Sequence, residues 1–403
     1  MTMVSVQEAV KIIQAHQGYY STESVLLEQA TGRILAEDLL ADRDMPPFNR
    51  ATMDGIAISY QAYRKGIRQF RIKGTQAAGD PPIELEEPGD CIEIMTGSAL
   101  PATADAVVPY EDIVVNEAGA SLQSGVQPGQ NIHAKGKDKK QADLLVAANT
   151  LVTPSIIAVA ASIGKSRLPV KKLPHIVVIS TGNELVEIES VPLPQQIRRS
   201  NNYMICSVLE ELKLVADMLH LPDEQQVVEQ QVGQALNDYD VVLLSGGVSM
   251  GKFDFVPAAL KALAVEELFH KVKQRPGKPL WFGRQQGKGT LVFGFPGNPV
   301  ATFLCLHRYF IPWLTASLGM PAAPRLYAAL DTPVQFAPPL QYFLQVNWQI
   351  NEQGLSVARP EEGNGSGDFS NLLQVNAFME LPAAQNSFRE GEVFPIWPFK
   401  RGF

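Results

Sequence analysis

Apolar residues recur at helical spacing near the start of the chain. The segment from Ser5 to Glu8 has the pattern of a capping box, in which a serine and a glutamate each accept a hydrogen bond from the other's backbone N–H. Val6, Ala9, Val10 and Ile13 then fall on one face of a helix. The pattern predicts an amphipathic N-terminal helix.

The pattern changes between residues 41 and 140. Short apolar runs such as FRIKG, CIEIM and AVVPY alternate with Gly-Asp, Pro-Gly and Pro-Pro pairs, which is typical of a compact β-rich region. Thr153 and Pro154 then have the residue types that begin a helix, and Gly164 the type that ends one.

Strands and helices alternate from residue 175 onward. HIVVIS, VVLLS and TLVFGF are continuous apolar runs, and helical patterns begin at about Asn202, Glu224 and Pro299. This order predicts an open, mostly parallel α/β sheet with helices on both faces. After residue 320, runs such as YFLQVNWQI and NAFMEL predict a small all-β C-terminal domain.

These changes of pattern divide the chain into four expected domains. They are an N-terminal and linker domain (residues 1–40 plus 140–172), a β-rich domain (41–139), an α/β domain (173–320) and a C-terminal β domain (321–403).

Composition excludes several classes of protein. Of 403 residues, 45% are hydrophobic and only 19% charged, which is too apolar for a disordered chain. Lys and Arg total 34 against 42 Asp and Glu, without a long basic run, so nucleic acid is not expected as the main partner. The N-terminus lacks the features of a signal peptide, and no apolar stretch is long enough to span a bilayer. We therefore expect a cytoplasmic protein with no membrane partner.

Cysteine and histidine give no metal or disulfide pattern. Cys91, Cys206 and Cys305 are far apart in apolar segments, so we expect them to pack in the core. The six histidines show no pair at metal-ligand spacing, which argues against a zinc site.

Three expected strands of the α/β domain end in loops that contain glycine. The loops begin at Gly182, at Gly246-Gly247 and at Pro296-Gly297. Ligands of open α/β sheets bind at the carboxyl ends of the strands, where loop glycines let backbone N–H groups approach a phosphate. Each loop alone is as well explained as a tight turn, but three at successive strand ends indicate one phosphate pocket. None matches a dinucleotide-binding or Walker motif.

Acidic residues accompany these loops and occur in the earlier domain. Carboxylates next to a phosphate would repel it unless a hard cation such as Mg²⁺ lay between them, so they suggest a magnesium-dependent phosphate site. The acids are Asp54, Asp138, Glu184, Asp223 and Asp254. Taken singly, Asp223 is equally well explained as a helix N-cap and Asp54 as a turn residue.

A basic segment from Lys271 to Pro279 interrupts the acidic chain. Pro276 and Pro279 restrict the backbone on both sides of Lys278, which would lower the cost of aiming its side chain at an anion. We expect an oxyanion clamp, with a solvated turn as the alternative. No Ser-His-Asp order, nucleophile elbow or reactive Cys-His pair supports covalent hydrolysis.

Taken together, these segments resemble the MoeA family, the molybdopterin molybdenumtransferases, which include the C-terminal domain of gephyrin. The matches are PPFNRATMDGIAI (46–58), IMTGSALPATADAVV (94–108), KGKDK (135–139), VVISTGNEL (177–185), LLSGGVSMGKFD (243–254), RPGKPLWFG (275–283) and FGFPGNPVA (293–301), with a weaker one in GSGDFSN near residue 365.

The resemblance implies an elongated homodimer with a molybdopterin-binding α/β domain and a barrel-like C-terminal domain. The active site would lie between the α/β domain of one subunit and the β-rich domain of the other. The family takes adenylated molybdopterin and molybdate, releases AMP with a divalent cation, and inserts molybdenum onto the dithiolene sulfurs. The upstream adenylyltransferase and acceptor molybdenum enzymes are implied as partners.

The resemblance also implies roles for individual residues. The five acids listed above would form the catalytic group, with Glu184 and Asp254 as magnesium ligands. Residues implied for the pterin phosphate and adenylate are Thr181, Gly182, Gly246, Gly247, Ser249, Pro296, Gly297, Asn298 and Pro299. Those implied for molybdate are Arg275, Lys278, Arg359 and Ser366, and Thr96 is a further substrate-binding residue.

Several positions depart from the family's usual residues. His133 stands in place of an arginine, Lys137 of a glutamate, Asn183 of an aspartate, Arg199 of an acid and Ala301 of a serine. Ile56 likewise replaces an aromatic residue. These changes bear on substrate affinity more than on the class of reaction, and His133 could supply a positive charge if it were protonated.

Two alternative functions share the fold. A molybdopterin adenylyltransferase would share the GGVSMGKFD segment but lack the N-terminal and C-terminal domains expected here. A molybdopterin-binding scaffold without turnover would fit the substituted positions, but it would gain nothing from keeping all five acids around an anion.

Overall fold

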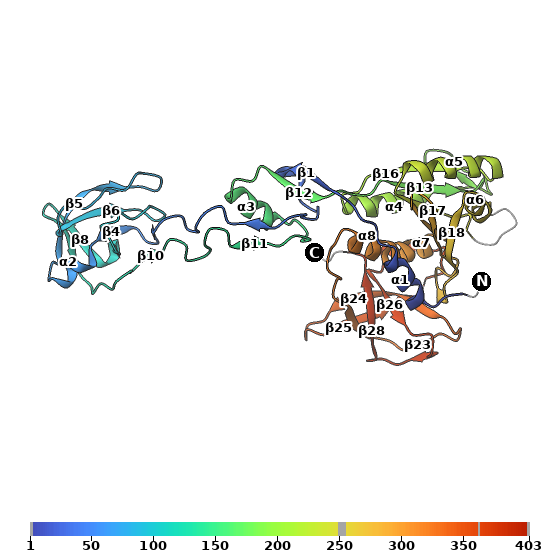
Figure 1. The fold of residues 1–403 in the computed structure, drawn as a ribbon. Helices are drawn as coiled ribbons and strands as arrows, with labels where there is room; N and C mark the ends of the chain where they lie inside the picture. Colours follow the sequence, from blue (N-terminus) through green and yellow to red (C-terminus); the bar gives the residue numbers. More distant parts are fainter. Residues whose placement is uncertain (1–2, 249–254, 362, 401–403) are drawn as a thin grey trace. The chain divides into compact units, whose positions relative to one another are not determined.

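The computed structural model describes residues 3–248, 255–361 and 363–400, and the chain forms two compact units (Figure 1). Unit 1 comprises residues 1–36, 149–153 and 168–403, and unit 2 comprises residues 37–148 and 154–167. Ser249 and Asp254, to which the sequence assigns substrate and metal binding, lie outside the described residues. The four domain boundaries given by the sequence pattern stay predictions.

Unit 2 is built around a six-stranded sheet of order β7-β4-β6-β5-β9-β8. Its apolar side chains form buried clusters on the two faces, with Ile56 and Val108 in one and Ala57 and Val107 in the other. The elements are β4 (Gly55–Ile58), α2 (Tyr60–Arg64), β5 (Gln69–Gln76), β6 (Asp90–Ile94), β7 (Ala106–Pro109), η2 (Tyr110–Asp112), β8 (Ile113–Asn116) and β9 (Gly119–Leu122). The predicted β-rich character of this region is confirmed.

Two short antiparallel pairs and one helix complete unit 2. β3 (Arg50–Ala51) pairs with β10 (Ile132–His133), and β2 (Leu39–Leu40) pairs with β11 (Leu144–Val146). The helix begins where Thr153 and Pro154 predict it, as α3 (Pro154–Ser162).

The α/β part of unit 1 contains a six-stranded sheet of order β16-β13-β17-β21-β20-β18. Its elements are β13 (Ile176–Thr181), α4 (Ser200–Glu211), β16 (Ala216–Leu221), α5 (Gln225–Asp238), β17 (Val241–Ser245), α6 (Val256–Ala262), β18 (Val265–His270), β20 (Trp281–Gln285) and β21 (Leu291–Phe295). The first four strands in the sheet order are parallel. β20 runs antiparallel to them, and the edge strand β18, which pairs antiparallel with β20, runs in their direction again. The mostly parallel α/β sheet is confirmed, and β20 and β18 were not predicted.

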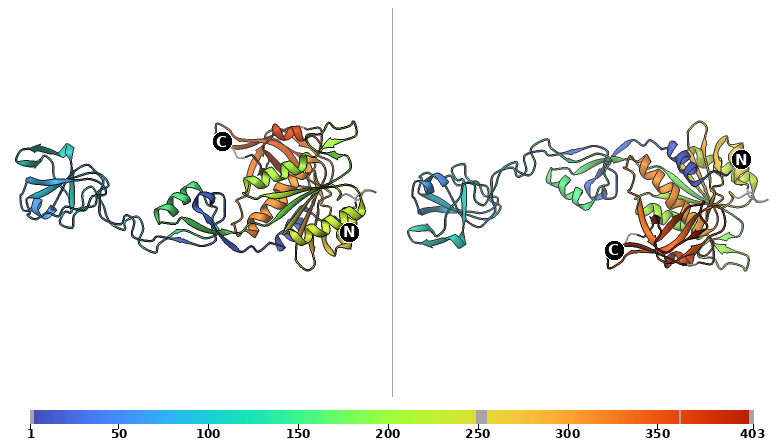
Figure 2. Two further views of the ribbon diagram at one scale, coloured as in Figure 1. Left: turned by 90° about the horizontal axis from the view of Figure 1, so that it is seen from above. Right: turned by 90° about the horizontal axis from the view of Figure 1, so that it is seen from below.

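Helices cover both faces of this sheet (Figure 2), and side chains alternate between the two faces along the central strands. On β13, Ile176 and Val178 join a core with α1, α4, α7 and α8, whereas Val177 and Ile179 join a core with α5 and α6. Both faces are therefore buried, which explains why these strands are continuous apolar runs.

The long helix predicted from Pro299 is interrupted. It consists of α7 (Pro299–Cys305), a π-helical turn η3 (Leu306–Phe310) and α8 (Ile311–Ser317). Pro312 lies just after the turn and has no N–H to donate to the preceding turn, so the wider turn relieves a local conflict in the helix.

The C-terminal part of unit 1 is a closed five-stranded barrel. β22, β24, β25, β26 and β28 form it, because β24 pairs with both β25 and β26. The elements are β22 (Leu326–Leu330), β23 (Val334–Gln335), β24 (Gln341–Ile350), β25 (Ser356–Pro360), η4 (Phe369–Leu373), β26 (Ala377–Leu381), β27 (Ser387–Phe388) and β28 (Val393–Pro398). The barrel implied by the resemblance is confirmed.

The N-terminal helix α1 (Val6–Ala15) packs against the α/β core. The predicted capping box is present, with Ser5 Oγ accepting from Glu8 N and Glu8 Oε2 accepting from Ser5 N. The short elements that follow are β1 (Thr22–Leu26), η1 (Leu27–Gln29) and β12 (Arg167–Lys171), with β14 (Leu185–Val186), β15 (Ile197–Arg198) and β19 (Gln274–Arg275) later in the chain.

Two predictions from composition can be compared with this fold. Cys91 and Cys305 are buried, Cys206 is half-buried, and all three are free thiols. Among the helices of the described residues, none combines the length and the apolar composition needed to cross a bilayer.

Candidate functional site

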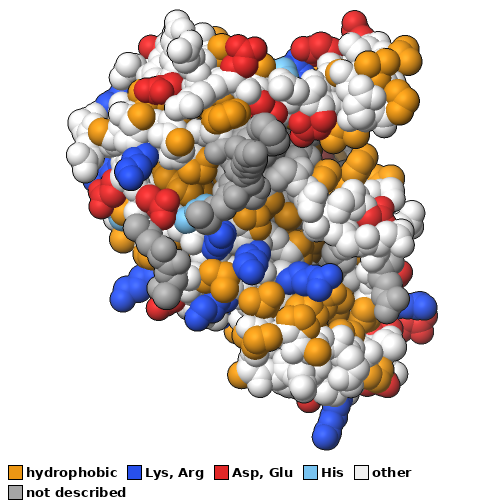
Figure 3. Space-filling view, turned by 90° about the vertical axis from the view of Figure 1, so that its right-hand side faces the viewer, with side chains coloured by type: hydrophobic (Ala, Val, Ile, Leu, Met, Phe, Trp, Pro, Cys, Tyr) orange, Lys and Arg blue, Asp and Glu red, His pale blue; other side chains and the backbone are white. Residues whose placement is uncertain are grey.

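Unit 1 contains two adjoining cavities that share Pro279 and Pro296 in their walls. The smaller, of about 650 Å³, lies at the carboxyl ends of β13, β17 and β21. The larger, of about 1130 Å³, lies between the α/β part and the barrel. We call them the glycine cavity and the cationic cavity. Figure 3 shows Lys and Arg side chains gathered along a hollow on one face of the molecule.

The glycine cavity brings together the three loops that the sequence singles out. Its walls include Thr181, Gly182, Gly246, Gly247 and Gly297. Gly247 has a φ of 67°, and a Cβ there would lie 2.4 Å from Thr181 Oγ1. Only glycine therefore permits this close approach of two neighbouring strand ends.

Asparagines at the start of α4 hold these loops together, and they were not assigned to the site from the sequence. Asn201 Nδ2 donates to Ser245 Oγ at 2.9 Å and to Gly297 O at 2.8 Å, which joins the ends of β17 and β21. Asn202, which is buried, donates to Ser180 Oγ on β13 at 3.2 Å. In the sequence, the one feature that could have indicated these two asparagines is their position as adjacent polar residues at the start of an expected helix in the domain with the three glycine loops.

The two described acids of the glycine cavity differ in their surroundings. Asp223 Oδ2 accepts from the backbone N–H of Asn183 at 3.1 Å, and Asn183 Oδ1 accepts from the backbone N–H of Asp223 at 3.2 Å. Asp223 thus bonds to the β13 loop and does not cap α5, whose N-cap is Glu224. Glu184 is exposed, and the described residues contain no cation paired with it.

The donor set of this cavity suits a hard cation. Its described walls contain two carboxylates and no Lys or Arg. In residues 3–248, 255–361 and 363–400, no three His, Cys, Asp or Glu side chains are grouped to hold a metal. Mg²⁺ commonly takes one or two protein carboxylates and fills its remaining positions with water and substrate phosphates, so the exposed carboxylate of Glu184 fits this ion.

The cationic cavity collects the basic residues predicted to bind an oxyanion. Arg275, Lys278 and Arg359 all lie in its walls, and none has an ion pair within the described part of the chain. β19, which carries Arg275, pairs with barrel strand β24, so the barrel holds one end of the clamp. Glu361 is the one acid in the described walls.

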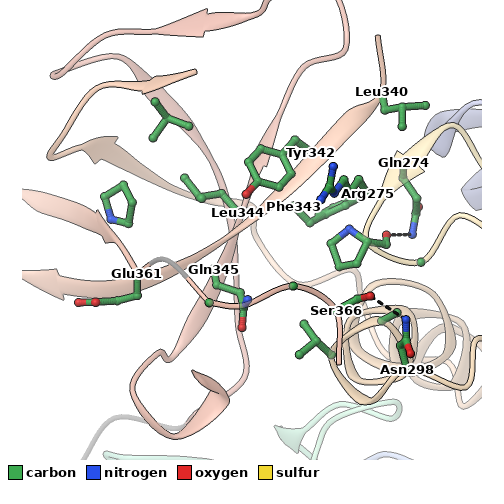
Figure 4. A pocket seen from close by; sticks show the side chains of 18 of the residues that line it. Gln274, Arg275, Asn298, Leu340, Tyr342, Phe343, Leu344, Gln345, Glu361 and Ser366 are labelled. Carbon is green, nitrogen blue, oxygen red and sulfur yellow. Dashed lines mark hydrogen bonds between the residues drawn. The ribbon is translucent and has the colours of Figure 1, made fainter. Parts of the chain in front are cut away.

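Ser366 and Asn298 meet at the edge of the cationic cavity, as Figure 4 shows. Asn298 Nδ2 donates to Ser366 Oγ at 2.7 Å, and Val300 N donates to Ser366 O at 3.1 Å. The loop after β21 therefore contacts both cavities, with Gly297 on the glycine cavity and Asn298 on the cationic one. Pro299 begins α7 and lines neither cavity.

Asp54 and Thr96, in unit 2, contact each other. Asp54 Oδ1 accepts hydrogen bonds from Thr96 N at 2.6 Å and Thr96 Oγ1 at 2.8 Å. These bonds, the backbone one first, hold the pKa of Asp54 below its usual value. The next residue, Gly55, has to be glycine, because a Cβ there would lie 2.0 Å from Val108 O on β7.

Asp138 is bonded to His133, the residue that replaces the family's usual arginine. His133 Nε2 lies 2.8 Å from Asp138 Oδ1, and Arg50 Nη2 lies 3.1 Å from His133 Nδ1. Because a guanidinium can only donate, Nδ1 must accept and Nε2 must carry the proton given to Asp138. In this arrangement the imidazole is neutral, and Arg50 supplies the positive charge that His133 was suggested to provide.

The remaining departures are also accounted for locally. Arg199 forms an ion pair with Glu187, and Lys137 is exposed. Ile56 and Ala301 are both buried, Ile56 in the core of the unit 2 sheet. Ile56 therefore acts in packing.

Comparisons with known proteins cover nearly the whole chain. Residues 4–164 match the MoeA N-terminal region (domain I and II), residues 177–316 a probable molybdopterin binding domain, and residues 327–399 the MoeA C-terminal region (domain IV). A molybdopterin molybdenumtransferase of Synechocystis sp. is 37% identical, with 98% of this chain and 100% of the relative covered. One of Staphylococcus epidermidis is 30% identical, with 98% and 95% covered.

A solved structure has the same architecture. The molybdopterin biosynthesis moeA protein from Pyrococcus horikoshii OT3 superposes with a TM-score of 0.84 at 28% identity, covering 99% of this chain and 100% of the other. The similarity extends over both units and the barrel.

Proposed function

The chain belongs to the MoeA family and has molybdopterin molybdenumtransferase activity in molybdenum cofactor biosynthesis, and from this premise we propose how its two cavities divide the reaction. The glycine cavity binds the phosphate and adenylate of adenylated molybdopterin. The cationic cavity binds molybdate, which is a substrate. The observation that carries this proposal is the shared wall at Pro279 and Pro296, because it sets the two binding sites side by side.

The glycine cavity is suited to hydrolysis of a phosphoanhydride. Backbone N–H groups of the loops at Gly182, Gly246 and Gly297 bind phosphate oxygens. Glu184, together with Asp254, would hold Mg²⁺, which when bound neutralises charge on the phosphates. In the reaction, the oxygen of a water bonds to phosphorus, the bond to the bridging oxygen breaks, and AMP leaves.

The carboxylates have separate roles in this proposal. Asp223 is already bonded to the β13 loop and acts by shaping the cavity. Asp54 and Asp138 orient the attacking water or the leaving oxyanion, for which an ionised Asp54 is suited because its pKa is lowered. Thr96 keeps Asp54 in this state.

The cationic cavity is suited to a tetraoxoanion. Three cations without described ion pairs attract a doubly negative molybdate, and the Ser366 hydroxyl adds a hydrogen-bond donor at its edge. The adenylyltransferase alternative is set aside because the chain matches molybdenumtransferases over their full length, including the N-terminal and C-terminal regions.

The first experiment measures AMP release from adenylated molybdopterin by the purified chain with Mg²⁺, with and without molybdate. We expect molybdate to stimulate release and active cofactor to appear. Binding of the pterin without release would instead support the scaffold alternative. Omission of Mg²⁺ tests the metal separately, since release at an unchanged rate would remove it from the proposal.

Lys278→Ala tests the assignment of molybdate to the cationic cavity. Loss of one clamp charge should raise the molybdate concentration for half-maximal stimulation by about tenfold or more and leave pterin binding unchanged. Lys288→Ala is a control, because Lys288 bonds to the carbonyls of Asn237 and Tyr239, away from both cavities. Equal loss of both responses in Lys278→Ala would contradict the division of roles.

We also propose that the chain works as a homodimer in which the acids of unit 2 serve the partner's glycine cavity. Mixing inactive Asp54→Asn and Glu184→Gln variants would then restore part of the activity, because mixed dimers contain one intact site. A mixture that stays inactive, although the subunits exchange, would refute shared sites. The upstream adenylyltransferase and acceptor molybdenum enzymes remain proposed partners.

A further inference from the structure

A buried glutamine lies directly under the clamp that carries Arg275 and Lys278. Gln274 is fully buried on β19, beside Arg275 in sequence. Its Nε2 donates to the backbone carbonyl of Pro276 at 3.0 Å, a bond drawn in Figure 4. The same nitrogen lies 3.8 Å from Cys305 Sγ on α7. Gln274 thus connects the turn between the two clamp cations to the helix beneath it.

Tyr309 fixes the other end of this amide. Its hydroxyl donates to Gln274 Oε1, and the residue is only 1% exposed. Tyr309 belongs to η3, the π-helical turn between α7 and α8. Such turns widen a helix locally and redirect one side chain, which here brings the phenol to Gln274. Because Gln274 Oε1 is occupied by Tyr309, its Nε2 is oriented toward the clamp.

The clamp turn rests on this amide with no spare room. Gly277, between Pro276 and Lys278, has a φ of 88°. A Cβ at Gly277 would lie 2.6 Å from Gln274 Nε2 and 2.8 Å from Cys305 Sγ. The backbone of the turn therefore contacts the side chain of Gln274 directly, and a displacement of Gln274 would be transmitted to the turn.

We propose that Gln274 and Tyr309 are positioning residues, which hold Arg275 and Lys278 in the geometry that binds the oxyanion. The inference rests on the proposed role of the cationic cavity. The two clamp side chains are exposed and have no described ion pair, so their placement depends on the backbone that carries them. Rigid support lowers the entropy lost when an anion binds.

Tyr309→Phe is the direct test, because it removes one hydroxyl and keeps the buried ring. We expect the molybdate concentration for half-maximal stimulation of AMP release to rise roughly threefold to tenfold, as for loss of one buried hydrogen bond. The maximal rate at saturating molybdate and the KM for adenylated molybdopterin should stay unchanged, since the glycine cavity is untouched.

Tyr239→Phe is the matched control. Its hydroxyl also donates to a side chain, Asp217 at 2.6 Å, but Tyr239 lines neither cavity. Thermal unfolding of both variants is recorded alongside. A purely structural role of Tyr309 would lower the unfolding temperature and the active fraction without changing the molybdate dependence, and that result would overturn the proposal.

Gln274→Met provides a second variant, of similar length but without the amide. We expect it to weaken the molybdate response at least as much as Tyr309→Phe. If it fails to fold, Tyr309→Phe still decides the question. The experiment also separates the positioning role of Gln274 and Tyr309 from the molybdate-binding role of the cationic cavity. A wild type without a molybdate response refutes the role of the cationic cavity. A responsive wild type with an unchanged Tyr309→Phe variant refutes only the positioning role.

Discussion

At the scale of single residues, hydrogen bonds decide which carboxylates are available for chemistry. Asp223 is tied to the β13 loop through Asn183, while Glu184 in the same cavity has no described cation partner. In unit 2, Asp54 receives two bonds from Thr96, and Asp138 receives one from His133. These acids have different hydrogen-bond partners. Substituting one partner should therefore change the properties of its own acid and leave the other acids unaffected.

Thr96→Ala should raise the pKa of Asp54 while leaving it below its ordinary value. The variant removes the hydroxyl donor but keeps the backbone N–H of residue 96, which is the larger cause of the lowered pKa. Asp54 would then become protonated at a higher pH than in the wild type. Carboxyl NMR titration of Asp54 measures this, and identical titration curves in the two proteins would contradict the prediction.

His133→Gln should retain most of the activity of the wild type. A glutamine amide can accept from Arg50 and donate to Asp138, as the neutral imidazole does. His133→Ala loses both bonds and should lower AMP release by roughly tenfold, the effect of losing one or two such bonds. If His133 acted through a positive charge, the His133→Gln variant would be as inactive as His133→Ala. Comparing AMP release by the two variants therefore distinguishes a hydrogen-bonding role from a charged one.

At the scale of elements, the strands and helices that could be predicted are those whose hydrophobic pattern agrees with the faces they bury. β13, β17 and β21 are buried on both faces and appear as continuous apolar runs. β18 was missed because VEELFH mixes acids with apolar residues at the sheet edge. β20 was missed because WFGRQ is short and ends in polar residues. The π-helical turn was not predicted, although Pro312 just after it indicates a local conflict in the helix. The turn also brings Tyr309 to Gln274, a contact that the sequence does not indicate.

The π-helical turn also makes the protein sensitive to acid. His307 lies there against the rings of Phe303 and Phe399, and its Nε2 atom is buried without a hydrogen-bond partner among the described residues. Burial lowers the pKa of His307 from 6.5 to about 4. The unfolded chain therefore binds a proton between these values that the folded chain does not, so stability falls as pH drops from 6.5 to 4.

His307→Leu should remove this part of the pH dependence. In the wild type, the free energy of unfolding should fall by roughly 3 kcal/mol between about pH 7 and 4, because each unit of pKa difference corresponds to about 1.4 kcal/mol. Urea unfolding at about pH 7, 5.5 and 4 measures it, with the exposed His175→Gln variant as control. If His307→Leu lost as much stability on acidification as the wild type, His307 would not be the group responsible.

At the scale of the whole molecule, the α/β part and the barrel of unit 1 are joined by a buried polar cluster. Arg308 Nε donates to Glu380 Oε2 at 3.2 Å, and both residues are buried. Trp397 Nε1 and Gln341 Nε2 also donate to Glu380, and the Arg308 guanidinium lies 4.2 Å from the Trp397 ring. Motifs identified the cavity residues here, but nothing in the sequence pairs positions 308 and 380.

Arg308→Met should therefore destabilise unit 1 by about 3–5 kcal/mol, because it leaves the Glu380 carboxylate buried without its cation. Lys73→Met is the control, since Lys73 pairs at 3.4 Å with an exposed Glu86, and loss of a surface pair costs about 1 kcal/mol or less. Denaturant unfolding followed by circular dichroism compares them, because the four tryptophans lie in unit 1 and Lys73 lies in unit 2. Because the cationic cavity lies between the parts joined by Arg308, the variant should also weaken the molybdate response while it is still folded. Equal stability of the two variants would show that packing alone joins the barrel to the α/β part.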